Sequence, residues 1–168
     1  MAANPSRLFD PGLLLAAVDA QRKARGLTWA ELSRQLNVSV STMKGMPAKT
    51  VLEADGVLQM TRWLGRRVES FCGPGADPGS GPEPGDRLST GRFLRFDSRA
   101  LYAAVEAACR RRGVSLEQAR QEIPWTGPVS RAVLTRLKEG GRVDLYQVLA
   151  IVGWLGARVE DFTHLTRG

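Results

Sequence analysis

The sequence of 168 residues has only one histidine and two cysteines, and aromatic residues make up 7% of it. His164 has no nucleophile or acid at an informative spacing, and we expect it to be a tail residue. Cys72 and Cys109 are not spaced as a pair of metal ligands, which indicates two isolated, reduced thiols. A glycine-rich phosphate-binding loop is missing too. These absences indicate a protein that is not an enzyme and has no metal or cofactor.

Long apolar runs are missing as well. No run reaches the ~20 residues that a membrane helix requires, and the first ten residues lack the hydrophobic stretch of a signal peptide. We therefore expect a cytoplasmic protein that does not enter a membrane. Because 43% of the residues are hydrophobic and 24% are charged, the chain can fold around a core.

The sequence has an excess of positive charge and one segment that is rich in glycine and proline. The chain carries 24 Lys and Arg against 17 Asp and Glu, a net charge of +7. Residues 73–91 hold 10 of the 27 Gly and Pro residues and have a net charge of −2, which is typical of a flexible linker. Residues 1–72 and 92–168 carry +4 and +5. The positive charge therefore belongs to the two flanking segments.

The two flanking segments are copies of one another. They align at an offset of 87 residues and then, past the middle of each copy, at an offset of 91. We call residues 7–72 the first repeat and residues 92–166 the second repeat. The four extra residues of the second repeat lie within Pro124–Pro128. Matching segments are Phe9-Asp10 with Phe96-Asp97, Arg25 to Thr28 with Arg112 to Ser115, and Trp63 to Gly65 with Trp154 to Gly156.

Each repeat has the pattern of several short helices. In the first repeat, Gly26 is placed to end one helix. Thr28 and Glu31 have the spacing of a capping box for a second helix, which should bury Leu32 and Leu36. The sequence predicts an all-α fold of two tandem bundles of about five helices each, joined by the linker.

A sharp turn is expected directly after the second helix. Asn37 suits a left-handed backbone conformation. Ser39 can cap a third helix that buries Met43 and Met46, and Pro47 limits the length of that helix.

Residues 26–43 resemble the helix-turn-helix of the phage-repressor/Cro (Xre-type) family of DNA-binding proteins. Leu27-Thr28 begins the motif, Ser33 is the small residue that lets the two helices approach, and Val38-Ser39 follows the turn. The resemblance extends over nearly all of both repeats. It implies that the third helix of a repeat lies in the major groove of DNA.

The second repeat departs from this pattern. Arg120 stands where the first repeat has Ser33, and a longer segment, Pro124–Pro128, replaces the tight turn. Either the two helices cross at a wider angle or the alignment shifts by one residue. The third helix stays amphipathic, with Val133, Leu134 and Leu137 facing inward and Arg131, Thr135, Arg136 and Lys138 facing outward.

The resemblance assigns DNA contacts residue by residue. In the first repeat, Val40 can offer only an apolar contact to a thymine methyl group, whereas Arg131 and Arg136 of the second repeat can bind guanine or phosphate. We expect the second repeat to supply more of the affinity. The alternative is that these charges belong to solvated helix faces. The predicted DNA-contacting residues are Thr28, Trp29, Ser39, Val40, Ser41, Thr42, Lys44 and Lys49 in the first repeat, and Thr126, Ser130, Arg131, Ala132, Thr135, Arg136, Lys138 and Arg142 in the second.

The tryptophans leave further alternatives open. Trp29 and Trp125 fall near the side expected to face the groove, which would allow a phosphate or sugar contact. Trp63 and Trp154 occupy matching places, and they are either docking surfaces between the repeats or residues with ordinary core or half-exposed packing.

The resulting hypothesis is a sequence-specific transcriptional regulator of the bacterial type that binds double-stranded DNA. A flexible linker of 19 residues spans about 24 Å, and adjacent major grooves lie ~34 Å apart, so one chain can reach both as a pseudo-dimer. A homodimer is the other possible assembly. The alternative function is a protein-interaction module, antitoxin-like or adaptor, in which the same scaffold binds a protein partner.

Overall fold

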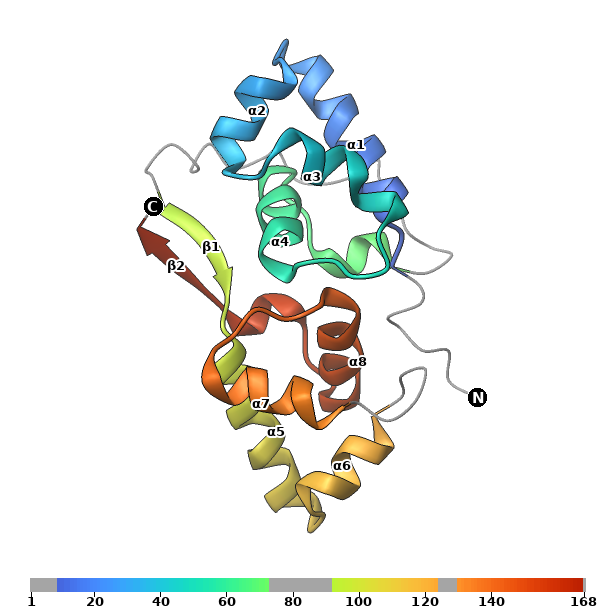
Figure 1. Cartoon of the computed structure of the whole chain (residues 1–168), viewed down its shortest axis with the longest axis vertical. Coiled ribbons are helices and arrows are strands. Elements are labelled where there is room, and N and C mark those ends of the chain that lie inside the picture. Colours follow the sequence, from blue (N-terminus) through green and yellow to red (C-terminus); the bar gives the residue numbers. More distant parts are fainter. Residues whose placement is uncertain (1–8, 73–91, 124–129, 168) are drawn as a thin grey trace.

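A computed structural model of the chain describes residues 9–72, 92–123 and 130–167. In these ranges the structure is mostly helical, as expected, with a small two-stranded sheet (Figure 1). The first repeat contains α1 (Pro11–Ala24), α2 (Trp29–Leu36), α3 (Val40–Gly45), η2 (Met46–Ala48), α4 (Ala54–Trp63) and η3 (Val68–Phe71). The second contains β1 (Arg92–Phe96), α5 (Ser98–Arg112), α6 (Leu116–Glu122), α7 (Arg131–Glu139), α8 (Leu145–Leu155) and η5 (Val159–Phe162). The strand β2 (Thr163–Arg167) lies at its C-terminal end.

Side-chain caps set the helix starts in the first repeat. The Asp10 carboxylate accepts from the Leu13 amide at 3.0 Å and Pro11 opens α1. The capping box of α2 is present: the Thr28 amide donates to Glu31 at 2.7 Å, and the Glu31 amide donates to the Thr28 hydroxyl at 3.1 Å. These local signals lie within four residues of the helix they start, so the sequence was sufficient to predict them.

The turn between α2 and α3 has the predicted geometry. Asn37 is left-handed, with φ 54° and ψ 39°. The Ser33 hydroxyl donates to the Val38 carbonyl at 2.7 Å, and Val38 itself is 8% exposed. Ser39 caps α3 by accepting from the Thr42 amide. A small side chain at position 33 therefore holds the two helices close and satisfies the backbone of the turn.

The second repeat follows the same order with different contacts. Ser115 and Gln118 form the capping box of α6, and Ser130 caps α7 by accepting from the Val133 amide. Where the first repeat has its left-handed Asn37, α6 ends at Ile123 with φ −65° and ψ 121°. The longer turn expected at Pro124–Pro128 lies outside the described residues.

The two-stranded sheet corrects the prediction of an all-α fold. β1 and β2 pair antiparallel, with Phe96 opposite Thr163 and Arg95 opposite His164. Two strands alone are marginally stable. The first repeat stabilises β1, because the Phe96 amide donates to the Asp55 carboxylate of α4 at 2.7 Å. Helix periodicity could not reveal a ribbon that depends on the other repeat. His164, expected in a tail, lies in β2 with its Nδ1 3.8 Å from Asp97.

The two repeats pack against each other around a pseudo-twofold axis. The Ala54 amide donates to the Val143 carbonyl at 3.3 Å, and the Leu145 amide donates to the Leu52 carbonyl at 2.7 Å. Leu52 and Ala54 align with Val143 and Leu145 at the offset of 91 residues, so the two bonds are equivalent. In Figure 1, a half turn about the viewing direction brings α1 to α4 onto the places of α5 to α8. α4 and α8 face each other across this axis.

The paired tryptophans pack within their own repeats. Trp63 is 1% exposed, with the Arg25 guanidinium 4.9 Å from its ring centroid. Trp154 is half-buried beneath Arg112, whose guanidinium lies 4.2 Å from the ring centroid. The structure therefore favours core packing for Trp63 and half-exposed packing for Trp154 over docking between the repeats. None of the helices in the described ranges combines the length and apolar character needed to cross a membrane.

Candidate nucleic-acid interface

The outer face of α3 is small and mostly hydroxylic. Ser41 and Lys44 are exposed and Val40 and Thr42 are half-buried, while Met43 points into the core. The Ser39 hydroxyl donates to the Thr42 hydroxyl at 2.7 Å and lies 3.2 Å from that of Ser41. The hydroxyl groups thus satisfy one another and remain open to a ligand on their outer side.

Trp29 carries two cations on its ring. The Arg22 guanidinium lies 4.7 Å and the Lys44 ammonium 5.0 Å from the ring centroid. Arg22 is also bound to Asp19 and donates to the Leu27 carbonyl at 2.7 Å. Trp29 is half-buried and Thr28, beside it, is exposed. The ring therefore positions Lys44 at the junction of α2 and α3. The contact of Arg22 with the same ring was not predicted from the sequence.

The outer face of α7 is more basic. Arg131, Ala132, Thr135, Arg136 and Lys138 are exposed, while Val133, Leu134 and Leu137 are buried, as predicted. Within the described ranges, neither Arg136 nor Lys138 has an acidic partner. These two side chains are available to an anionic ligand.

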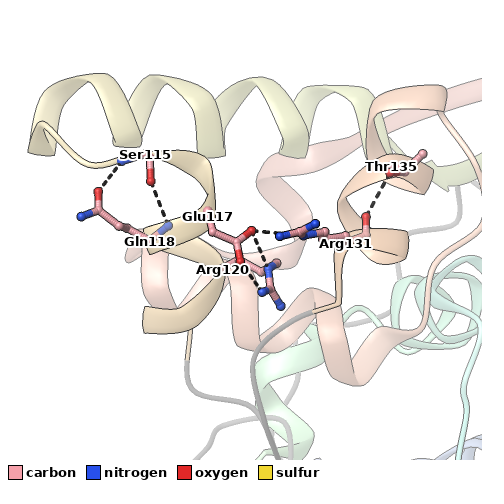
Figure 2. Close-up of polar contacts among 6 residues, drawn as sticks. All are labelled: Ser115, Glu117, Gln118, Arg120, Arg131 and Thr135. Carbon is pink, nitrogen blue, oxygen red and sulfur yellow. Dashed lines mark hydrogen bonds and ion pairs between the residues drawn. The ribbon is translucent and has the colours of Figure 1, made fainter.

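Arg131 is engaged in an ion pair that was not predicted from the sequence. Figure 2 shows Glu117 of α6 between Arg120 and Arg131, with 3.3 Å between Arg131 Nε and Glu117 Oε2. Hydrogen bonds from Arg120 first, and from Arg131 second, lower the pKa of Glu117 to about 2. The Glu117–Arg120 spacing of three residues was readable from the sequence, but the contact with Arg131 depends on how α6 and α7 pack. The Arg131 side chain is still 79% exposed.

Packing of the two repeats brings Lys49 and Arg142 to one cavity of about 460 Å³. Arg142 Nε lies 3.4 Å from Glu53, and the Arg142 side chain is 82% exposed. The α2–α3 turn, α4 and Arg95 complete the walls. Lys49 and Arg142 were predicted separately from the sequence, whereas the fold places them together at the junction of the repeats. Thr126 and Trp125 lie outside the described residues.

The pseudo-twofold axis relates the two exposed helix faces. It places α3 and α7 at equivalent positions of the two repeats (Figure 1). Among the described residues, no group of three or more His, Cys, Asp or Glu is arranged to hold a metal ion.

Comparison of the chain with protein-family models, with curated proteins and with solved structures found no match.

Proposed function

We propose that this chain is a transcriptional regulator that binds double-stranded DNA through two helix-turn-helix units, α2–α3 and α6–α7. The observation that carries the proposal is the pseudo-twofold pairing of the repeats, which presents α3 and α7 equivalently. Proteins that use this motif as a dimer bind half-sites about one helical turn apart with two symmetry-related helices. Here a single chain supplies both helices.

The two helix faces favour different roles in binding. α7 offers Arg136 and Lys138, with Arg131 beside them, and arginine can bind a guanine edge or grip phosphate. α3 offers hydroxyl groups and one lysine, which suit phosphate contacts and weak base contacts. We expect an asymmetric operator in which the half-site bound by α7 is the stronger one.

Docking of the repeats also changes the role of the linker. The sequence alone predicts two heads on a flexible tether, but backbone hydrogen bonds join the repeats directly. The spacing of the two half-sites should then follow from the interface between the repeats. The linker raises the effective concentration of one repeat near the other.

Selection of bound sequences from random duplex DNA tests the proposal. We expect two unequal half-sites at one fixed spacing, and an affinity that falls by about three orders of magnitude between roughly 50 and 200 mM salt for ~6 phosphate contacts. Arg136→Ala should weaken binding strongly. Arg158→Ala is the matched control, because Arg158 is an exposed arginine that lies at η5 and not on α7. Failure to enrich any sequence would contradict the proposal.

A protein-interaction module is the second candidate, and the Glu117–Arg131 ion pair favours it. This pair places a carboxylate on the face that would approach DNA. Beside it, Tyr102, Leu116 and Leu134 contribute to a groove of about 370 Å³. A protein partner held by apolar contacts should bind with little dependence on salt, which separates the two functions.

A further inference from the structure

Two equivalent glutamates join the repeats where η3 packs against η5. The Val68 amide donates to Glu160 Oε1 at 2.7 Å, and the Val159 amide donates to Glu69 Oε1 at 2.9 Å. Val68 and Glu69 align with Val159 and Glu160 at the offset of 91 residues, so the two bonds are related by the pseudo-twofold axis. Each carboxyl group thus caps the first residue of the other repeat's 3-10 helix.

The second oxygen of each carboxyl group is the unusual feature. Glu69 Oε2 and Glu160 Oε2 are both buried without a hydrogen-bond partner among the described residues. The crossed hydrogen bonds bring the two side chains close together, because each carboxyl group binds the amide of the residue that precedes the other glutamate. Two ionised carboxylates are acceptors only, so they cannot bond to each other. A hydrogen bond between them forms when one of the two carries a proton, and without it two negative charges share a partly dehydrated site.

We propose that Glu69 and Glu160 share one proton when the repeats are docked, and that release of this proton to solvent weakens the contact between the repeats. The contact at Leu52–Ala54 and Val143–Leu145 combines backbone hydrogen bonds with one carboxylate, since the Leu52 amide also donates to Asp144 at 3.0 Å and burial raises the pKa of that carboxyl group. What sets the glutamate pair apart is that it brings one carboxyl group from each repeat together. This inference holds whether the ligand of the chain is DNA or a protein.

The surroundings of the pair support this assignment. Burial, which is the largest cause, and the neighbouring Glu69 together raise the pKa of Glu160 to about 7, against the opposing hydrogen bond from Val68. Cys72 faces the two carboxyl groups, and burial together with their charge raises the pKa of its thiol to about 12, so it stays neutral. Arg62 Nη1 of α4 is buried without a hydrogen-bond partner among the described residues, and burial lowers the pKa of this guanidinium.

The other charged groups on the packed elements are engaged elsewhere. α8 has no charged residue between Leu145 and Leu155. Several other charged side chains have partners of their own: Arg66 lies over the Phe71 ring, Arg22 and Lys23 of α1 pair with Asp19, Arg95 of β1 pairs with Asp55, Arg110 of α5 pairs with Glu106, Asp161 of η5 accepts from the Arg158 amide, and Asp10 and Asp97 cap α1 and α5. Arg67 and Arg158, which precede Val68 and Val159, are exposed to solvent.

The direction of the pH effect follows from the raised pKa of Glu160. The folded chain holds the proton up to about pH 7, whereas an unfolded chain releases it near the ordinary glutamate pKa of 4.5. The stabilisation is thus complete below about pH 4.5 and is lost as the pH rises through about 7. For one proton, the unfolding equilibrium constant changes by at most about tenfold per pH unit.

Urea unfolding of the full chain at several pH values between about 5 and 8 tests the inference. We expect the stability of the wild type to fall across this range. Glu160→Gln should flatten the profile, because its amide can donate to Glu69 and accept from Val68 without a titrating proton. Glu69→Gln, the pseudo-symmetric variant, should do the same. Glu106→Gln is the control: it removes a charge from the surface of α5 and should keep the wild-type profile.

Amide NMR signals provide a second measurement that does not depend on the variants. The amides of Val68 and Val159 should shift together with one midpoint near pH 7 in the wild type. Equal pH profiles for the wild type and both glutamine variants would overturn the inference. So would amide signals that do not titrate between about pH 6 and 8.

Discussion

The two repeats hold equivalent helices in different ways. In the first repeat, the Ser33 hydroxyl bonds to the Val38 carbonyl and Asn37 turns the chain through a left-handed conformation. In the second repeat, α6 ends in an extended conformation at Ile123, and Glu117 connects α6 to α7 by binding Arg120 and Arg131. A side-chain hydrogen bond to a backbone carbonyl in one repeat is thus matched by an ion-pair cluster in the other.

This difference shows how a duplicated unit can diverge without losing its framework. The caps at Thr28 and Ser115 and the backbone contacts between Ala54 and Val143 are shared features of the scaffold. The groups that join the second helix to the third differ, and they also set the charge on the exposed face. Divergence has therefore occurred where a ligand would bind.

Exchanging the residues at positions 33 and 120 tests most directly whether the two repeats join their second and third helices in different ways. Ser33→Arg should destabilise the chain by about 2–4 kcal/mol, because the larger side chain does not fit between α2 and α3 and the Val38 carbonyl loses its donor. Arg120→Ser should have a much smaller effect, since it removes a partner of Glu117 without crowding the core. Urea unfolding of both variants measures the difference. Equal losses would show that the two joints are not physically distinct.

The turn after α2 offers a second test, with a smaller effect. Asn37→Ala should cost about 1 kcal/mol, because alanine is strained in the left-handed region, whereas Asn37→Gly should be nearly neutral. Thermal unfolding of the two variants provides the measurement. If alanine and glycine were equivalent at this position, the left-handed conformation would not contribute to stability.

Features set by neighbouring residues were predictable from the sequence. Local residue types and their spacing indicate the capping boxes and the left-handed Asn37, and helix periodicity indicates that Met43 is buried. The contact between Glu69 and Glu160 joins residues far apart in the chain, and no local pattern encodes it. The same holds for β1, which is held by Asp55 of the other repeat.

The sequence predicted which side chains of the candidate site are exposed, but it did not predict the contacts between them. The sequence indicated that Arg136 and Lys138 face outward, because the apolar residues of α7 define its inner face. It did not indicate that Arg131 contacts Glu117, or that Lys49 and Arg142 meet at one cavity. These contacts depend on the angle between helices and on the docking of the repeats.

The smallest effect on stability is expected for a substitution of Glu117, the residue that binds Arg131 on the exposed face of α7. Arg120 and Arg131 lower the pKa of Glu117 from the ordinary glutamate value of 4.5 to about 2. The contribution of Glu117 is therefore present above pH 4.5 and is lost as the pH falls from 4.5 to about 2. Glu117→Gln should remove this acid-dependent loss and lower the stability near neutral pH to the same small extent, because the ion pairs of this solvent-exposed carboxylate are absent at every pH. Urea unfolding at low pH is the measurement.

The same substitution makes the face of α7 more basic and releases Arg131. If the chain binds DNA, Glu117→Gln should raise the affinity a few-fold and steepen its dependence on salt, because one more cation can neutralise a phosphate. Glu106→Gln removes the same charge from α5 and should leave the slope unchanged, which separates a local effect from that of net charge. An unchanged slope for Glu117→Gln would mean that Arg131 serves only to join α6 to α7, as the Ser33 hydroxyl does in the first repeat.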